Sequence, residues 1–227
     1  MPMVHPAVQY VRGVLDGSIP ASLMIRRAVE RYTRDLEYGQ ARGLHFDRTA
    51  AEYAIDFFGL LKHSKGEWAG QPFQLAPWQQ FILWNLFGWK GADGLRRFQT
   101  AFVEVPRKNG KSTLTAGIGL FLLTMDGESG AEIYSAATKR DQAKILWEEA
   151  ARMVAASPSL RHLVAHWRSS STLSVESTHS KFLPLGADAD TLDGLNVHGA
   201  LIDELHAHRT SEVVDVLQTA TGARRQA

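Results

Sequence analysis

The first third of the chain carries apolar residues at a helical period. A helix-start signal at residues 20–22 is followed by apolar positions at three- and four-residue spacing through Tyr32, which predicts a helix. A second run of this kind covers residues 49–61. After a loop rich in Gly and Pro, residues 78–89 are densely apolar and predict a buried helix. We therefore expect residues 1–65 to form an N-terminal helical region.

The pattern changes at residue 98. Residues 98–105 alternate with a period of two and predict a strand, and residues 111–125 predict a long apolar helix. A short strand over 131–136 and an amphipathic helix over 139–156 follow, the latter stopped by Pro158. The order strand, helix, strand, helix is typical of a parallel sheet with crossover helices.

The last part of the chain predicts three more strands and a helix. Residues 172–175 and 181–185 resemble a β pair, and residues 210–221 can form one helix. Residues 197–202 are almost all apolar, which suits a strand covered on both faces. The expected fold class is α/β, with a mainly parallel sheet flanked by helices.

Composition narrows the possible classes. The chain has 227 residues, of which 44% are hydrophobic and 22% charged, as in a packed globular protein. It contains no cysteine, which excludes disulfides, thiolate metal sites and cysteine nucleophiles. A net charge of +1 excludes the strongly basic coat-like binders of nucleic acid. Neither a signal-peptide pattern nor a run of 18 apolar residues is present, so we expect no membrane association.

The segment Gly110-Lys111-Ser112 lies between the strand predicted over 98–105 and the helix that follows it. In this context backbone N–H groups cradle phosphates, the Lys111 ammonium reaches the β- and γ-phosphates, and the Ser112 hydroxyl holds Mg²⁺. The match is imperfect, because Val105 occupies the position of the expected first glycine. An ordinary helix N-terminus that carries Lys and Ser is the alternative.

A second motif lies at the end of the strand over 197–202, where Asp203 and Glu204 follow directly. In a P-loop ATPase the first carboxylate accepts from water on Mg²⁺, and the second orients and deprotonates the attacking water. A helix N-cap could explain Asp203 alone. The long interval between Lys111 and Asp203 leaves room for an intervening strand. The two motifs together predict a P-loop NTPase of the additional-strand, catalytic-Glu class.

Five spaced motifs resemble the large terminase subunit of tailed bacteriophages, the ATPase that packages DNA into proheads. The resemblance covers roughly residues 66–227. The motifs, in the order in which that family has them, are Leu75-Ala76-Pro77-Trp78-Gln79, Pro106-Arg107-Lys108-Asn109-Gly110-Lys111-Ser112, Ser135-Ala136-Ala137-Thr138-Lys139-Arg140-Asp141-Gln142-Ala143, Asp193-Gly194-Leu195-Asn196 and Leu201-Ile202-Asp203-Glu204-Leu205-His206. In this family the loop typically carries Arg in place of the expected glycines, so Val105 is tolerable.

The resemblance implies cofactors and site residues. The cofactors are ATP and Mg²⁺, with Ser112 and Asp203 as metal ligands, and the catalytic residues are Glu204, Lys111 and Arg107. The nucleotide-binding residues are Gln79, Pro106, Arg107, Lys108, Asn109, Gly110, Lys111, Ser112 and Thr113. Gln79 would bind adenine, and a surface glutamine on its helix is the alternative. Arg107 would contact the γ-phosphate, and a solvated loop cation is the alternative.

The resemblance also implies partners. The module would power translocation of double-stranded viral DNA into a prohead, with the portal protein and the small terminase subunit as partners, as part of a homo-oligomeric ring. It would act in the host bacterial cytoplasm, transiently at the portal vertex. Thr138, Lys139 and Arg140 either touch DNA phosphates or are the exposed start of a helix. Arg168, Arg224 and Arg225 are the candidates for an arginine supplied across a subunit interface.

Other features point away from further chemistry. Only 23 residues follow Glu204, so we expect a truncated ATPase domain over 66–227 without its next strand or a nuclease domain. His206 and His208, and the acids Asp188, Asp190 and Asp193, are interpreted as solvated residues rather than metal ligands. Trp78, Trp84 and Trp89 are interpreted as core residues. A catalytically incomplete fragment that serves nucleotide binding or oligomerisation, and a helicase-like ATPase, are the alternative functions.

Overall fold

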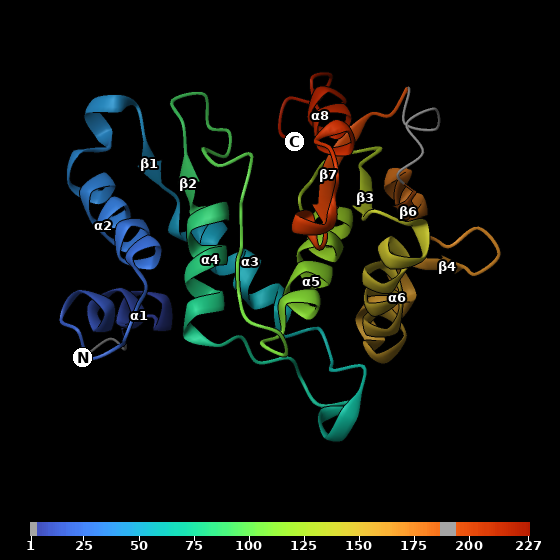
Figure 1. Ribbon diagram of the computed structural model, residues 1–227, viewed down its shortest axis with the longest axis horizontal. Coiled ribbons are helices and arrows are strands. Elements are labelled where there is room, and N and C mark those ends of the chain that lie inside the picture. Colours follow the sequence, from blue (N-terminus) through green and yellow to red (C-terminus); the bar gives the residue numbers. More distant parts are fainter. Residues whose placement is uncertain (1–3, 187–193) are drawn as a thin grey trace. The chain divides into compact units, whose positions relative to one another are not determined.

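The computed structural model describes residues 4–186 and 194–227 (Figure 1). The chain forms two compact units. The helical unit consists of Met1–Gly59 and Gln74–Val103, and the P-loop unit consists of Leu60–Phe73 and Glu104–Ala227. The units therefore interleave along the sequence. The division into a helical region 1–65 and an ATPase domain 66–227 stays a prediction about domains.

The helical unit has four helices and one short two-stranded sheet among its described residues. Its elements are α1 (Pro6–Leu15), α2 (Leu23–Tyr38), η1 (Gln40–Arg42), β1 (His45–Phe46), α3 (Arg48–Phe58), α4 (Pro77–Gly88) and β2 (Trp89–Lys90). Strands β1 and β2 pair antiparallel. Side chains cap three of the helices, as His5 accepts from the Ala7 amide at 3.2 Å, Ser22 from the Ile25 amide at 3.4 Å and Asp47 from the Ala50 amide at 2.9 Å. The predicted helices here are confirmed.

Aromatic side chains fill the core of the helical unit. Trp84 and Trp89 are buried, and Trp78 packs against the same cluster, as predicted. The Trp84 indole donates to the Tyr32 hydroxyl at 2.9 Å, which satisfies both polar tips inside the core. The ring of Tyr32 also meets that of Phe81 edge to face. These contacts join α2 to α4.

The P-loop unit contains most of the helices and strands predicted after residue 110. Its larger elements are α5 (Lys111–Thr124), β3 (Glu132–Ala136), α6 (Arg140–Ala156), α7 (Pro158–Leu163), β4 (Ala165–Trp167), β5 (Thr172–Val175), β6 (Ser180–Leu185), β7 (Val197–Ile202) and α8 (Glu212–Thr219). Short 3-10 turns lie at η2 (Gly66–Trp68), η3 (Glu176–Thr178) and η5 (Leu205–Ala207). The strands form one sheet of order β4-β5-β6-β3-β7.

This sheet is mixed rather than mainly parallel, so the prediction was only half right. Strand β3 pairs parallel with β6 and with β7. Strands β4, β5 and β6 pair antiparallel, because short connections join them and short connections can only turn the chain back. Strand β4 and helix α7 had no prediction, since both are too short to produce a periodic pattern.

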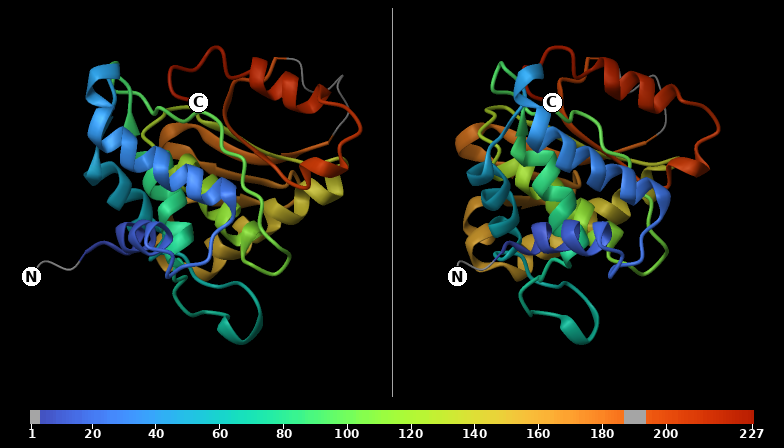
Figure 2. Two further views of the ribbon diagram at one scale, coloured as in Figure 1. Left: turned by 60° about the vertical axis from the view of Figure 1, so that its left-hand side comes forward. Right: turned by 90° about the vertical axis from the view of Figure 1, so that its left-hand side faces the viewer.

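Helices cover both faces of the sheet. Helix α8 packs on one face through Val213 and Leu217, and α5 and α6 contact the strands from the other (Figure 2). Helix α5 approaches closely at Gly119, where an added Cβ would lie 2.6 Å from Cδ1 of Leu201 and 3.0 Å from the ring of Phe182. Only glycine allows this separation. The close approach packs α5 directly against β6 and β7.

The strand predicted over residues 98–105 is not formed, which corrects the sequence analysis. The segment has no ladder partner, and the Phe102 side chain is 73% exposed. Alternation gives a segment one apolar face, but its backbone N–H and C=O groups still need a neighbouring strand to form a ladder. In the described sheet β7 pairs only with β3. The segment therefore reaches the phosphate loop as extended chain.

The segment Leu60–Phe73 belongs to the P-loop unit and contacts α6. Leu61 is buried, and the Ser64 hydroxyl donates to the Glu149 carboxylate at 2.6 Å. Lys65 lies 3.4 Å from the same carboxylate. Burial raises the pKa of Glu149, but the hydrogen bonds from Ser64 and Arg152 outweigh that effect and leave the pKa below its ordinary value.

Within the described part of the chain, no helix has the length and apolar character needed to span a bilayer.

Candidate nucleotide-binding site

The loop that precedes α5 contains backbone conformations that few residues other than glycine adopt. Lys108 and Gly110 both have positive φ, 67° and 74°. The Asn109 amide donates to the carbonyls of Pro106 and Arg107, each at 3.2 Å, so it closes the loop on itself. Left-handed backbone at a non-glycine residue costs free energy and is concentrated at functional sites. In this structure Asn109 supports the loop.

The N-terminus of α5 is open to an anion. Helix α5 begins at Lys111 with Gly110 as N-cap, and no side chain caps it. The first amides of a helix have no intrahelical acceptor, and the helix dipole adds partial positive charge there. Ser112 and Thr113 lie in this first turn. Backbone N–H groups that face a phosphate are therefore available where the motif predicted them.

Two carboxylates lie at the carboxyl end of β7. The Asp203 amide donates to the Ala136 carbonyl at 3.0 Å, so β7 and β3 end together at this edge of the sheet. Glu204 then adopts a left-handed conformation with φ of 50°. This turn ends the strand. Its strain at a charged residue is the second such outlier in the site.

The side chain of Lys111 joins the two motifs. Its ammonium lies 2.9 Å from Asp203 and 3.0 Å from Glu204. Hydrogen bonding to this ammonium lowers the pKa of Glu204. Burial lowers the pKa of Lys111, but the hydrogen bonds to both carboxylates outweigh it and raise that pKa. The Lys111 ammonium and the Glu204 carboxylate are therefore both charged at neutral pH.

The charges of this centre do not balance. One ammonium faces two carboxylates, and the Asp203 and Glu204 side chains are 20% and 47% exposed. Carboxylate and hydroxyl oxygens are the donors that Mg²⁺ prefers. The donor set of Ser112 and Asp203 fits this cation, and the excess negative charge of the centre favours it.

The other predicted residues are placed differently. Gln79 is a buried residue of the helical unit, not a surface glutamine, and its Oε1 accepts from the Ala76 amide at 2.9 Å at the start of α4. Arg107 is exposed in the loop, and its charge adds slightly to the lowering of the Glu204 pKa. The roles of both toward nucleotide stay predictions.

The segment after β3 reaches the same sheet edge as Asp203. The Ser135 hydroxyl is buried and donates to the Ala143 carbonyl at 2.9 Å, which fixes the turn into α6. The Thr138 hydroxyl donates to Gln142 at 2.5 Å. Lys139 and Arg140 are exposed at the start of α6. Loops at the carboxyl edge of parallel strands are the usual place for ligands in α/β proteins.

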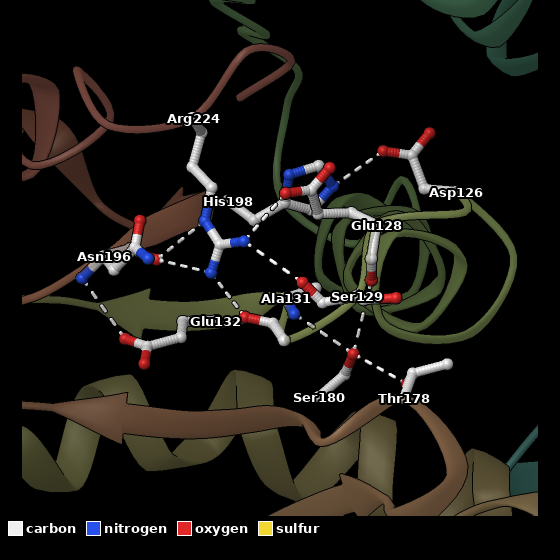
Figure 3. A network of polar contacts seen from close by, with 11 residues as sticks. Asp126, Glu128, Ser129, Ala131, Glu132, Thr178, Ser180, Asn196, His198 and Arg224 are labelled. Atoms are coloured by element: carbon white, nitrogen blue, oxygen red, sulfur yellow. Dashed lines mark hydrogen bonds and ion pairs between the residues drawn. The ribbon is translucent and has the colours of Figure 1, made fainter.

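The three candidate arginines differ in their surroundings. The side chain of Arg224 is 10% exposed, donates to Glu128 at 2.7 Å and to the Ser129 carbonyl at 3.2 Å, and also contacts the Gly130 carbonyl (Figure 3). It fastens the chain after α8 to the loop before β3. A guanidinium so engaged within its own subunit is not free to reach another. Arg225 and Arg168 are exposed.

Sequence reasoning gave no sign of a buried pair at the start of β7, the end of the strand opposite to Asp203. His198 lies in β7 at a shift in the β3–β7 register, and its Nε2 is 2.7 Å from Asp126 after the end of α5 (Figure 3). The pair joins the P-loop helix to the strand that carries Asp203. Among the described residues no three His, Asp or Glu side chains gather as a metal site. His206 lies 3.5 Å from Glu204. Asp188, Asp190 and Asp193 fall outside the described residues.

The helix N-terminus, the strained loop and the carboxylate strand together define an α/β nucleotide-binding domain of the P-loop kind. The family of terminase large subunits, ATPase domain, matches residues 77–227. The chain belongs to this family, and the matched range contains the loop before α5 and the carboxylates after β7.

Individual relatives agree. The large terminase subunit of Enterobacteria phage HK97 is 32% identical over 163 residues, which are 70% of this chain and 31% of that protein. The crystal structure of the HK97 large terminase has a TM-score of 0.66 at 28% identity and covers 78% of this chain and 36% of that one. The chain spans about a third of the length of the HK97 relatives it matches.

Proposed function

We propose that this chain binds and hydrolyses ATP and that the hydrolysis powers translocation of double-stranded DNA in a phage packaging motor. The observation that carries the proposal is the contact of Lys111 with both Asp203 and Glu204. Lys111 and Asp203 are 92 residues apart in the sequence. Folding brings the lysine that we propose to bind phosphate into contact with both carboxylates. The family match supports the same conclusion.

Lys111 has two successive tasks. Without nucleotide its ammonium neutralises part of the charge on Asp203 and Glu204. When a triphosphate enters the open N-terminus of α5, the more highly charged phosphates attract the ammonium away from the carboxylates. The backbone amides of the first turn bind the same anion. Nucleotide binding therefore frees Glu204.

Glu204 then acts as the general base. Its pKa is lowered by the hydrogen bond from Lys111, so that contact makes it a weaker base. Departure of the ammonium raises the proton affinity of Glu204 at the moment when a water must be deprotonated. Arg107, in the exposed loop, would add positive charge near the γ-phosphate. Gln79 would recognise the adenine.

Ser112 and Asp203 would hold Mg²⁺, which when bound supplies charge neutralisation at the phosphates. The remaining loop residues that we propose to line the nucleotide are Pro106, Lys108, Asn109, Gly110 and Thr113.

We further propose that the fold is of the additional-strand class. The outer edge of β7 has no partner among the described strands, which supports the presence of a further strand beside it. The expected partners are viral double-stranded DNA, the portal protein, the small terminase subunit and further copies in a ring. Thr138, Lys139 and Arg140 would follow the nucleotide state at the shared sheet edge. The expected location is the host bacterial cytoplasm, transiently at the portal vertex.

The test of this proposal is the rate of ATP turnover in the Glu204→Gln variant. We expect a loss of about 10²- to 10⁴-fold, since a general base contributes on that scale. Glu212→Gln, at the first turn of α8, makes the same chemical change outside the site and should turn over ATP like the wild type. Equal rates for wild type and Glu204→Gln would remove the assigned role.

A further inference from the structure

The helical unit carries a concentration of arginines that the proposed ATP chemistry does not use. Arg27, Arg31 and Arg34 follow one another on α2 at four- and three-residue spacing, so they lie on one side of the helix. Arg27 and Arg34 are exposed, and Arg31 is half-buried. Arg97 lies next to them. We name these four residues the arginine face.

Arg31 and Arg97 meet on a single aromatic ring. The Arg31 guanidinium carbon lies 4.7 Å from the centroid of the Phe98 ring, and that of Arg97 lies 4.9 Å from the same centroid. A guanidinium that packs on a ring keeps the donors at its edge free for a planar acceptor. Phe98 thus orients two cations, of which Arg97 is also paired with Asp35 and Arg31 has no carboxylate partner in the described part of the chain.

The charges around this ring are also unbalanced, here toward positive. The Asp35 carboxylate is 1% exposed, and its two oxygens contact Arg42 and Arg97. Arg31 makes no ion pair with Asp35, and its Nε is buried without a hydrogen-bond partner among the described residues. Burial and the neighbouring Arg97 lower the pKa of Arg31, which reports the same unfavourable surroundings. An external anion would relieve them.

We propose that the arginine face binds the phosphate backbone of double-stranded DNA. Lys90 is the only lysine of the helical unit, and every other cationic side chain in it apart from histidine is an arginine. Arginine matches phosphate through two parallel hydrogen bonds. At about 1.5 Å rise per residue, the cations from Arg27 to Arg34 span about 10 Å, along which duplex DNA carries several charges.

Duplex DNA and an acidic protein segment are both anions that these arginines attract. Glu30 and Glu37 are exposed on the same helix and repel phosphates and carboxylates alike, so they do not decide between the two. The choice of duplex DNA as the occupant rests on the proposed function, whereas the anion site itself rests on the geometry of Arg31 and Arg97.

The test is binding of a fluorescent duplex of about 20 base pairs to the full chain, followed by anisotropy over a range of salt concentrations. We expect Arg31→Gln to weaken binding about five- to tenfold and to lower the slope of log K against log salt by about one. Arg34→Gln, which removes the charge of an exposed residue, should lower the slope similarly. Arg12→Gln is the matched control, because Arg12 is exposed on α1.

Three outcomes separate the possibilities. Loss of slope in Arg31→Gln and Arg34→Gln but not in Arg12→Gln supports the proposal. Equal behaviour of all three variants overturns it, and so does arginine-dependent binding of polyglutamate in place of DNA. ATP turnover without DNA, measured in the same variants, should be unchanged. Lys111→Ala should lose turnover while it keeps the wild-type salt slope, so failure of the ATPase proposal is distinguishable from failure of the DNA site.

Discussion

The chain has two carboxylate centres, one in each unit, that differ in solvent exposure and in charge balance. This difference distinguishes a centre that stabilises the fold from one that can bind a ligand. In the helical unit, Asp35 is 1% exposed and has two arginine partners. In the P-loop unit, Asp203 and Glu204 are 20% and 47% exposed and share one lysine. The first centre is saturated and holds α2, η1 and the segment after β2 together. The second has unused negative charge and is accessible to a cation.

The comparison extends to what surrounds each centre. Around Asp35 the excess charge is positive and lies at the surface, on the arginine face. Around Lys111 the excess charge is negative and lies beside an open helix N-terminus. The helical unit is thereby suited to bind an external anion. The P-loop unit is suited to bind an anion together with the cation that accompanies it. The predictions below test this contrast by changing one side of it at a time.

The largest effect is expected in the aromatic core of the helical unit. Trp84→Ala removes a 3% exposed side chain and leaves the Tyr32 hydroxyl without its donor. The expected loss is about 4 kcal/mol in the free energy of unfolding, measured by denaturant titration. Trp68→Ala is the control, because Trp68 is 54% exposed, and its effect should stay within about 0.5 kcal/mol. Similar losses in both would mean that Trp84 is not a core residue.

The saturated carboxylate should matter next. Asp35→Asn leaves Arg42 and Arg97 without a counter-charge and should cost about 3 kcal/mol in the free energy of unfolding. Glu30→Gln, an exposed change on the same helix, should cost less than about 0.5 kcal/mol. If Asp35→Asn costs no more than Glu30→Gln, the contacts of Asp35 with Arg42 and Arg97 contribute nothing to stability.

Close packing between α5 and the sheet should produce a smaller effect. Gly119→Ala forces a Cβ to within 2.6 Å of Leu201 and should cost about 1–3 kcal/mol. The double variant with Leu201→Val removes the clashing Cδ1 and should cost less than the sum of the two single changes. Additive costs would mean that α5 does not press on β7 at this point.

The smallest effect is the pH dependence that comes from Asp35. Burial alone would raise its pKa, but hydrogen bonds from Arg97 and Arg42 outweigh burial and leave the pKa below its ordinary value. A lowered folded-state pKa gives stability that is present above the unfolded-state pKa and is lost as pH falls through the folded-state pKa. Wild type should therefore lose stability below about pH 4 more steeply than Asp35→Asn. Parallel curves of unfolding free energy against pH for the two proteins would contradict the lowered pKa of Asp35.

Much of the fold was predictable because its long elements have strong periodicity. Helices α3, α4, α5 and α6 and strands β5, β6 and β7 lie within a few residues of their predicted bounds, whereas α2 continues to Tyr38, beyond the predicted pattern that ran through Tyr32. The strand over 98–105 was wrong, since a period-two pattern describes one segment and cannot supply its partner. The antiparallel share of the sheet escaped prediction because strand direction depends on connections, not on composition.

Part of the candidate nucleotide site was visible in the sequence. Lys111 does begin α5, and Asp203 and Glu204 do follow β7 directly, although the strand expected before the loop is not formed and the roles of these residues stay predictions. What sequence could not show is which groups touch in the folded chain. Arg224 looked like a free arginine and is engaged with Glu128, while His198 and Asp126 attracted no notice and form a buried pair. The arginine face was likewise invisible, because Arg97 and α2 are brought together only by folding.

The central claim is that Lys111 binds the nucleotide and Glu204 acts only on the water. Calorimetric titration with Mg²⁺ and ATP tests it most directly, with wild type, Lys111→Ala and Glu204→Gln compared under the same conditions. The account predicts that Lys111→Ala weakens binding by about two orders of magnitude, because its charge-assisted hydrogen bonds to phosphate are lost. Glu204→Gln should bind within a few-fold of wild type. Equal loss of binding in both variants, or in neither, would contradict the account.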